Sequence, residues 1–159
     1  MIVVSDTSPI RALDYLGLLP ILHELFDQVL IPPAVRDELT LPLPKFAAVE
    51  LSRYDFVEVR NPQDQDRLTQ LLRTLDRGEA EALTLALERH SPLILIDELK
   101  GRRVAAELGI VPLGAIGVLL RAKSRGLITE IRPHIEKLDE LRFFMSAALK
   151  TNALRMAGE

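Results

Sequence analysis

The stretch PLILID, residues 92–97, is the clearest strand of the sequence. Its aliphatic residues are continuous rather than alternating with polar ones, which is typical of a strand buried on both faces of a parallel sheet. Residues 2–5 (IVVS) predict a second such strand, and it too is followed directly by an aspartate. Asp6 and Asp97 are therefore expected at the carboxyl ends of two buried strands.

Further strands and helices alternate along the chain, with strands expected over residues 28–31, 56–59 and 110–113. Helices are expected over residues 9–18, 21–26, 33–39, 46–54, 68–75, 79–88, 102–108, 115–122, 129–141 and 146–157. This alternation implies right-handed βαβ units, so we predict an α/β fold whose mostly parallel sheet has helices on both faces. No repeat or linker divides the chain. We expect one domain over residues 1–159, with 126–159 as a helical C-terminal extension that covers the sheet or meets a partner.

The composition is that of an ordinary soluble domain, because 48% of the 159 residues are hydrophobic and 27% are charged. There is no cysteine, which excludes disulfides, thiolate metal sites and a cysteine nucleophile. With no tryptophan and 4% aromatic residues, an aromatic platform for single-stranded nucleic acid is not expected. No segment is apolar enough to cross a membrane, and no basic leader precedes Asp6. We therefore expect a cytoplasmic protein without membrane contact.

Charge is divided unevenly along the chain. Residues 1–99 hold nine Lys and Arg against 17 Asp and Glu, a balance of −8, whereas residues 100–159 hold 11 against six, a balance of +5. The resulting net charge of −3 argues against a generally basic nucleic-acid binder. The division is what a carboxylate site beside an anion-binding surface would give, although helices that merely differ in charge would give it too.

Acidic residues mark the places where a ligand could bind. In an open α/β sheet, ligands bind beyond the carboxyl ends of the strands, where Asp6 and Asp97 are expected. Capping of the following helix is the alternative role for each. Glu79 and Glu81 fall in the first turn of a predicted helix and point about 200° apart, so they are not expected to serve one site equally. Glu38, in a short predicted helix, is by itself a solvated side chain.

Several carboxylates in one cleft would repel one another and raise each other's pKa. A divalent cation removes this conflict, and oxygen ligands alone suit Mg²⁺ or Mn²⁺. One or two such ions could activate a water molecule and stabilise the charge that builds on a phosphodiester, with no protein nucleophile. Histidine offers no alternative centre, because the histidines are far apart in the sequence and lack the spacing of metal ligands.

Four motifs occur in order over residues 1–120: VVSDTSPI at 3–10, IPPAVRDEL at 31–39, DRGEAEAL at 76–83, and LIDE with GRRVA at 95–98 and 101–105. In this order and spacing they resemble the PIN-domain nucleases, above all the compact bacterial PIN proteins related to VapC-type toxins. A later stretch, GAIGVLLRAK at 114–123, is similar to that group as well.

The resemblance implies a three-layer α/β/α sandwich and Mg²⁺- or Mn²⁺-dependent hydrolysis of RNA. It assigns metal binding and catalysis to Asp6, Glu38, Glu81 and Asp97, with Glu98 and Glu79 as further candidate ligands. Glu81 is preferred to Glu79 because EALTLA at residues 81–86 matches the family's acid followed by an apolar helix. Glu81 departs from the commoner Asp of the family, and Glu98 stands where relatives often have a second Asp. The resemblance also implies homodimers and a toxin role with a small antitoxin partner.

Two hydroxyls and a group of basic side chains complete the predicted site. Ser8 or Thr7 would orient a metal-bound water, and Ser8 is also well placed to cap the helix that Pro9 opens. The basic residues that would hold an RNA backbone are Lys100, Arg102, Arg103, Arg121 and Lys123. A solvated helix face is the alternative for the last two. Phosphate contacts specify no base, so no target sequence is predicted.

The sequence thus predicts a metal-dependent ribonuclease. The alternative is a non-catalytic RNA-binding or regulatory module with the same fold, which a failure to cleave RNA in Mn²⁺ would favour. A third hypothesis is a phosphohydrolase with Asp6 as its nucleophile. That class carries a second acid two residues after the first, where this chain has Ser8.

Overall fold

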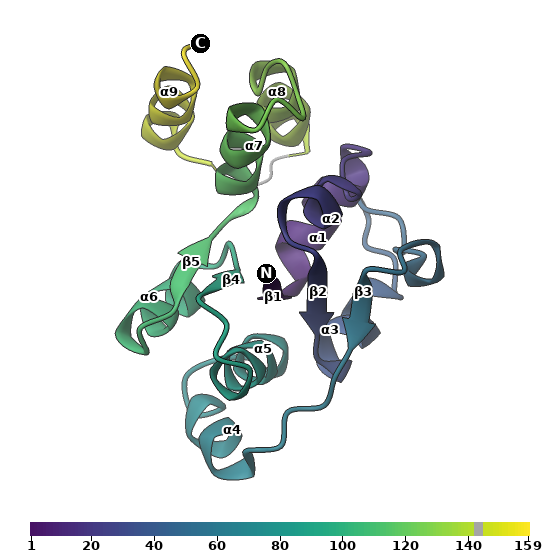
Figure 1. Ribbon diagram of the computed structural model, residues 1–159, viewed down its shortest axis with the longest axis vertical. Helices are drawn as coiled ribbons and strands as arrows, with labels where there is room; N and C mark the ends of the chain where they lie inside the picture. Colours follow the sequence, from purple (N-terminus) through teal and green to yellow (C-terminus); the bar gives the residue numbers. More distant parts are fainter. Residues whose placement is uncertain (142–144) are drawn as a thin grey trace.

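A central sheet organises the protein (Figure 1), and the computed structural model describes residues 1–141 and 145–159. The sheet that these residues form has five strands, all parallel, in the order β3-β2-β1-β4-β5. The strands are β1 (Ile2–Ser5), β2 (Gln28–Ile31), β3 (Val57–Val59), β4 (Leu93–Leu95) and β5 (Val111–Leu113). The predicted parallel sheet is confirmed.

The order of the strands reverses between β1 and β4. The chain adds β2 and then β3 on one side of β1, and β4 returns to its other side. Val4 consequently pairs with both Leu30 and Ile94. In open parallel sheets such a reversal opens a crevice beyond the carboxyl ends of the two strands. Asp6 and Asp97 follow these two strands, so both lie where the crevice opens.

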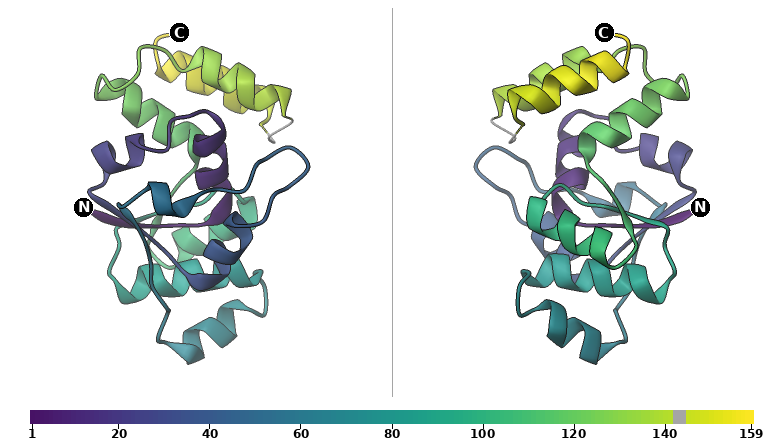
Figure 2. Two further views of the ribbon diagram at one scale, coloured as in Figure 1. Left: turned by 90° about the vertical axis from the view of Figure 1, so that its right-hand side faces the viewer. Right: turned by 90° about the vertical axis from the view of Figure 1, so that its left-hand side faces the viewer.

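Helices cover both faces of the sheet. The helices are α1 (Thr7–Tyr15), α2 (Ile21–Leu25), α3 (Pro33–Leu39), α4 (Gln65–Leu71), α5 (Arg77–Glu88), α6 (Leu99–Glu107), α7 (Ala115–Ser124), α8 (Arg132–Glu140) and α9 (Ala147–Met156). α4, α5 and α6 pack on one face, and α1, α2 and α7 pack on the other (Figure 2), which confirms the three-layer α/β/α sandwich. Within the described residues, no helix has both the length and the apolar character that a bilayer span requires.

Neighbouring residues of a strand contribute to opposite cores. Val3 is buried in the core beneath α1, α2 and α7, whereas Val4 is buried in the core beneath α4, α5 and α6. Leu93 and Leu95 likewise join the first core, and Ile94 joins the second. Both faces are covered, so Val3, Val4 and all of β4 are apolar, and this explains the continuous aliphatic runs of the sequence.

The helix predicted over residues 46–54 is wrong. The segment contains only a 3-10 turn, Leu51–Arg53, after a stretch without helical structure. The Val49 N–H donates to the Leu39 carbonyl at 2.8 Å, which holds the segment extended against the end of α3. Its apolar residues reach the core from this non-helical backbone: Val49 is buried in the core beneath α1, α2 and α7, and Phe46 lies edge-on to Tyr15 at 5.9 Å between ring centroids.

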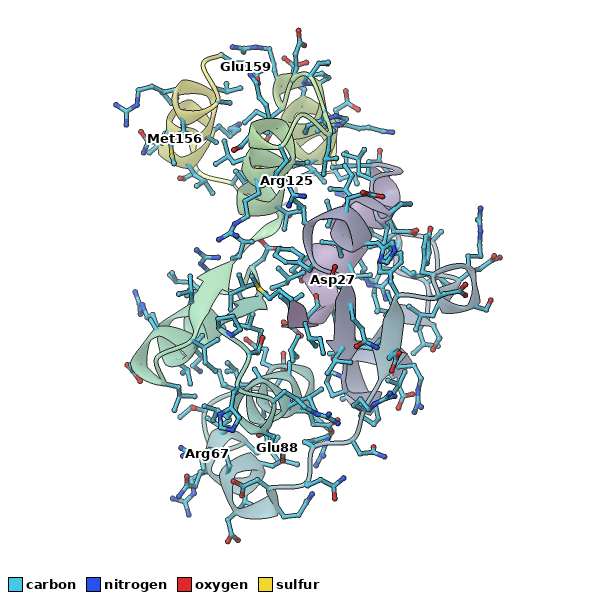
Figure 3. All side chains as sticks on the ribbon, viewed as in Figure 1. Asp27, Arg67, Glu88, Arg125, Met156 and Glu159 are labelled. Carbon is cyan, nitrogen blue, oxygen red and sulfur yellow. The ribbon has the colours of Figure 1, made fainter. Side chains whose placement is uncertain are left out.

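The end of the chain is fastened to α7 and α8. α8 and α9 stack beyond α7, at the opposite end of the molecule from α4 and α5 (Figures 1 and 3). The Glu159 carboxylate accepts hydrogen bonds from the backbone N–H groups of Ile131 and Arg132 at 2.8 and 3.0 Å, at the start of α8. It also accepts from Lys123 Nζ of α7 at 2.9 Å. Residues 142–144 of the predicted extension lie outside the described residues.

Candidate active site

Asp6 lies at the centre of a group of acidic side chains. It occupies the N-cap position of α1 with extended backbone, but its carboxylate makes no capping hydrogen bond. Only 5% of the residue is exposed. Burial raises the pKa of Asp6 from 3.8 to about 7; the Thr7 backbone N–H lowers this pKa, and the charges of Asp76, Glu38 and Asp97 raise it. The capping role considered for Asp6 is therefore not observed, and its carboxylate is available to a ligand.

Glu38 reaches the group from the last turn of α3. Its Oε2 accepts a hydrogen bond from the Thr7 hydroxyl in the first turn of α1. A Cβ at Gly78 would lie 2.8 Å from Glu38 Oε1 and 3.5 Å from Asp6 Oδ1. The missing side chain at Gly78 thus leaves the space in which the carboxylates of Glu38 and Asp6 approach each other.

The start of α5 supplies a further buried carboxylate, from Glu79. Asp76 caps this helix, because its Oδ1 accepts from the Glu79 N–H at 2.8 Å. Burial raises the pKa of Glu79 to about 8, and a side-chain hydrogen bond with Asp76 and the charges of Asp76 and Asp6 also raise it. Glu79 Oε2 is buried and has no hydrogen-bond partner among the described residues. This oxygen is therefore the kind of buried, unpaired acceptor that a cation would satisfy.

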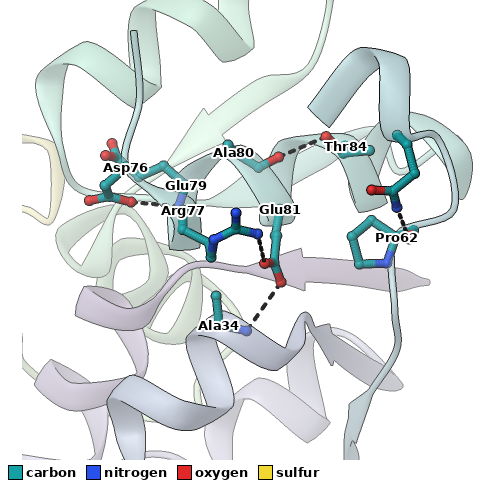
Figure 4. Close-up of polar contacts among 9 residues, drawn as sticks. Ala34, Pro62, Asp76, Arg77, Glu79, Ala80, Glu81 and Thr84 are labelled. Carbon is teal, nitrogen blue, oxygen red and sulfur yellow. Dashed lines mark hydrogen bonds and ion pairs between the residues drawn. The ribbon is translucent and has the colours of Figure 1, made fainter. Parts of the chain in front are cut away.

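Glu81 points away from this group, toward α3 (Figure 4). Its Oε1 accepts from the Ala34 N–H at 3.2 Å, and its Oε2 pairs with Arg77 NH1 at 3.2 Å. Both carboxylate oxygens of Glu81 thus already have partners within the fold. The structure consequently brings Glu79 to Asp6 and leaves Glu81 outside, as expected for side chains on nearly opposite sides of one helix.

Asp97 lies after β4 and faces the start of α7. Its Oδ1 accepts from the Ala115 N–H at 3.0 Å, whereas Oδ2 is buried and unpartnered within the described part of the chain. Burial raises the pKa of Asp97 to about 6; the Ala115 N–H and the charge of Arg102 lower this pKa, and Glu98 raises it. Asp97 therefore fixes α7 with one oxygen and keeps the other for the crevice. The neighbouring Glu98 is exposed at the N-cap of α6.

Of the two hydroxyls predicted for the site, Thr7 contacts the acidic group, through its hydrogen bond to Glu38. α1 begins at Thr7, so Ser8 is inside the helix and is not its N-cap. The capping role considered for Ser8 is therefore wrong. Ser8 is half-buried one position further along the first turn.

The predicted basic residues divide between two places. Lys100 and Arg103 are exposed on α6, and Arg102 of the same helix donates to the Ile96 carbonyl at 3.0 Å beside Asp97. Arg121 and Lys123 lie on α7 instead. Arg121 is exposed, but the Lys123 ammonium donates to the Ala157 carbonyl and to the Glu159 carboxylate. Lys123 therefore holds the C-terminal helix, and Arg102 is the basic residue of this set that lies against a site acid, Asp97.

The chemistry of the acidic group fits a divalent cation. Its donors are all carboxylate oxygens, and two of them are buried without a partner among the described residues. Burial, and then the charges of neighbouring acids, raise the pKa of Asp6 and Glu79. A cation would supply the opposite charge that these groups lack. The side chains of residues 1–141 and 145–159 do not, however, bring three acidic or histidine groups close enough together to hold a metal ion as they stand. The ligands would have to draw together around the ion.

Sequence reasoning missed Asp76 and Gly78 as parts of this site. Both residues belong to the motif DRGEAEAL at 76–83, but the sequence alone assigned neither of them a role in the site. The available signal was the Asp-x-x-Glu spacing of residues 76–79, which is a capping pattern that places its Glu in the third helical position.

The fold and this acidic crevice define an α/β protein with its site at the carboxyl edge of a parallel sheet. A model of the PIN-domain family DUF3368 matches residues 2–159. The chain therefore belongs to the PIN-domain family, whose members are generally nucleases that use divalent metals. No curated protein and no solved structure matched the chain. The relation to VapC-type toxins stays a prediction.

The raised pKa of Asp6 predicts how the stability of the metal-free protein depends on pH. A carboxyl with a higher pKa in the folded than in the unfolded state binds protons better when folded, so the stability it contributes is lost as pH rises through the folded pKa. For Asp6 this stability is lost as pH rises from the ordinary pKa of 3.8 to the folded pKa of about 7. We expect the free energy of unfolding, measured with urea in EDTA, to fall by about 2 kcal/mol more in wild type than in Asp6→Asn between pH 5.5 and 8.

Comparing the two proteins removes the contribution of groups that they share. His134 is one such group, because burial lowers its pKa and so makes it act in the opposite direction. An equal change with pH in wild type and Asp6→Asn would contradict a buried Asp6 that takes up a proton.

Proposed function

We propose that this protein is a metal-dependent ribonuclease that hydrolyses RNA phosphodiester bonds with Mg²⁺ or Mn²⁺. The observation that carries the proposal is the group of carboxylates at the switch point of the sheet, in which one oxygen of Glu79 and one of Asp97 are buried without a partner among the described residues. Membership of the PIN-domain family supports a nuclease. RNA as the substrate rests on the resemblance of the sequence motifs.

In this proposal Asp6, Glu38, Glu79 and Asp97 hold the cation. When bound, the cation supplies Lewis acidity and neutralises the charge that develops on the phosphodiester. Thr7 orients the Glu38 carboxylate, and Asp76 fixes the first turn of α5 from which Glu79 projects. Arg102 adjoins Asp97, where its positive charge would attract a phosphate of the substrate, while Lys100 and Arg103 would extend this attraction along α6.

A second candidate, an RNA-binding module without catalysis, is favoured by one observation. In the described residues no three acidic or histidine side chains stand close enough to hold a metal ion. The two candidates differ in whether RNA is cleaved or only bound. For either, the toxin role with a small antitoxin, the homodimer and the cytoplasmic location are proposals that rest on the resemblance and on the sequence.

The proposed reaction is tested by incubating a labelled RNA pool with purified wild type or Asp6→Asn, in Mn²⁺ or in EDTA. Asn nearly preserves the shape of Asp6 and removes one ligand charge. We expect cleavage only by wild type with Mn²⁺, with a loss of roughly 100-fold or more in Asp6→Asn. Binding of RNA without cleavage by wild type that also binds Mn²⁺ would favour the non-catalytic module. Cleavage retained by Asp6→Asn would remove Asp6 from the site.

Glu79 and Glu81 offer a matched pair of substitutions on one helix. We expect Glu79→Gln to weaken Mn²⁺ binding about 10-fold and to reduce cleavage at least as much, because it removes a ligand charge. Glu81→Gln should lose far less, because a glutamine oxygen can still accept the Ala34 N–H. Titration calorimetry with Mn²⁺ measures the difference. A larger loss in Glu81→Gln would restore the assignment made from the sequence motifs.

Lys100 and Arg103 are tested together by charge reversal. The double variant Lys100→Glu/Arg103→Glu should bind RNA at least about 10-fold more weakly, and its affinity should depend less on salt than that of wild type. Its affinity for Mn²⁺ should change little, because both side chains are exposed on α6 and neither is a ligand. Arg155→Glu on the distant α9 is the control. An equal effect of Arg155→Glu would mean that net charge, and not the α6 surface, attracts RNA.

A further inference from the structure

Arg11 is a buried charged side chain that the proposed reaction does not use. Only 6% of this residue is exposed. Its NH2 group donates to the carbonyls of Glu38 and Leu41, the latter at 2.7 Å, and its NH1 group donates to the Ala47 carbonyl at 3.5 Å. All three acceptors are backbone carbonyls, and the first belongs to a proposed metal ligand. The guanidinium therefore fastens the end of α3 and the loop that follows it to α1.

Arg11 and Thr7 act on Glu38 from the same face of α1. They are four residues apart in one helix, so their side chains lie one turn above each other. The Thr7 hydroxyl donates to the Glu38 carboxylate, and the Arg11 guanidinium donates to the Glu38 carbonyl. One helix thus holds the side chain and the main chain of the same residue. Two points of attachment restrict the direction of the carboxylate more than one does.

α3 needs such attachment because it is short and has no cap of its own. It spans seven residues, and its N-cap residue, Pro32, offers no side-chain hydrogen bond. Helices of this length are not stable without tertiary contacts. At its N-terminal end, Glu81 of α5 accepts the Ala34 N–H. At its C-terminal end, Arg11 binds the carbonyls of Glu38 and Leu41. Glu38 lies next to the second of these anchors.

We propose that Arg11 is a positioning residue for the metal-binding carboxylate of Glu38. This inference rests on the proposed function, in which Glu38 is a ligand. Arg11 acts through the backbone of Glu38 and touches neither the cation nor the RNA. Without the guanidinium, the Glu38 and Leu41 carbonyls lose a charged donor and the last turn of α3 is released, so the Glu38 carboxylate no longer keeps its place beside Asp6.

The sign of the effect separates positioning from simple electrostatics. Arg11 is a positive charge close to Glu38, so removing it would by charge alone strengthen the binding of a cation. Loss of positioning would instead weaken that binding. A weaker affinity for Mn²⁺ in a folded variant is therefore a result that charge removal does not predict.

The test is the dissociation constant of Mn²⁺, measured by titration calorimetry for wild type, Arg11→Met, Arg11→Lys, Glu38→Gln and the double variant Arg11→Met/Glu38→Gln. We expect Arg11→Met to raise the constant about 10-fold, and Arg11→Lys to raise it less because lysine keeps the charge and one donor group. In the double variant Arg11→Met should add little to the effect of Glu38→Gln, because the two residues act through one carboxylate. Lys45→Met, in the same loop, is the control and should bind Mn²⁺ as wild type does.

Circular dichroism and urea unfolding identify the variants that are folded. If Arg11→Met is unfolded, Arg11→Lys takes its place in the comparison. A folded Arg11 variant with the affinity of wild type, or a tighter one, overturns the proposal. The proposal is also overturned if Arg11→Met raises the dissociation constant by the same factor in wild type and in Glu38→Gln. Arg11 would then act on the fold as a whole and not through the Glu38 carboxylate. If wild type does not bind Mn²⁺, or Glu38→Gln binds it as well as wild type, the proposed metal site fails and this inference falls with it.

Discussion

The burial of several carboxylates beside one another is the constraint on which the rest of the structure depends. Burial and mutual repulsion raise the pKa of Asp6 and Glu79, so their charged forms are disfavoured where they lie. The fold accommodates them by leaving space: a Cβ at Gly78, Gly101 or Gly114 would intrude on a carboxylate in each case. This costly arrangement adds nothing to the stability of the fold by itself. A positively charged ligand would offset this cost, because it favours the charged forms of the carboxylates.

The acids that the sequence assigned to the site differ in what their oxygens contact. Glu81 gives both of its oxygens to the fold, to the Ala34 N–H and to Arg77, and it thereby connects α5 with α3. Glu79 and Asp97 each keep one buried oxygen without a partner among the described residues. Asp97 does both, since its other oxygen accepts the Ala115 N–H. Hydrogen bonds and an ion pair within the fold thus occupy both oxygens of Glu81 and one of Asp97, and they leave one oxygen of Glu79 and one of Asp97 available to a ligand.

The sequence was informative wherever a pattern had one physical explanation. Continuous aliphatic runs that end in Asp6 and Asp97 required a parallel sheet with two acids at one edge, and the structure has both. The sequence could not show whether Glu79 or Glu81 belongs to the site. Helical periodicity shows that the two side chains point in different directions, but it does not show which one faces Asp6. The segment over residues 46–54 has the composition of a helix, but its backbone is held by Leu39 and Arg11, which are remote in sequence. Contacts of that kind leave no local signature.

The reversal of strand order also determines when the crevice exists. The centre needs Asp6 beside β1 and both Glu79 and Asp97, which enter the chain only after β2 and β3 have been made. Domains assemble during synthesis from the N-terminus onward, but β4 must insert next to β1, the earliest strand, before the acids can meet. A ribosome that has produced only the first three strands therefore carries a chain without a working centre. In a PIN-domain chain built in this order, the acids of the site cannot meet until most of the chain has emerged from the ribosome.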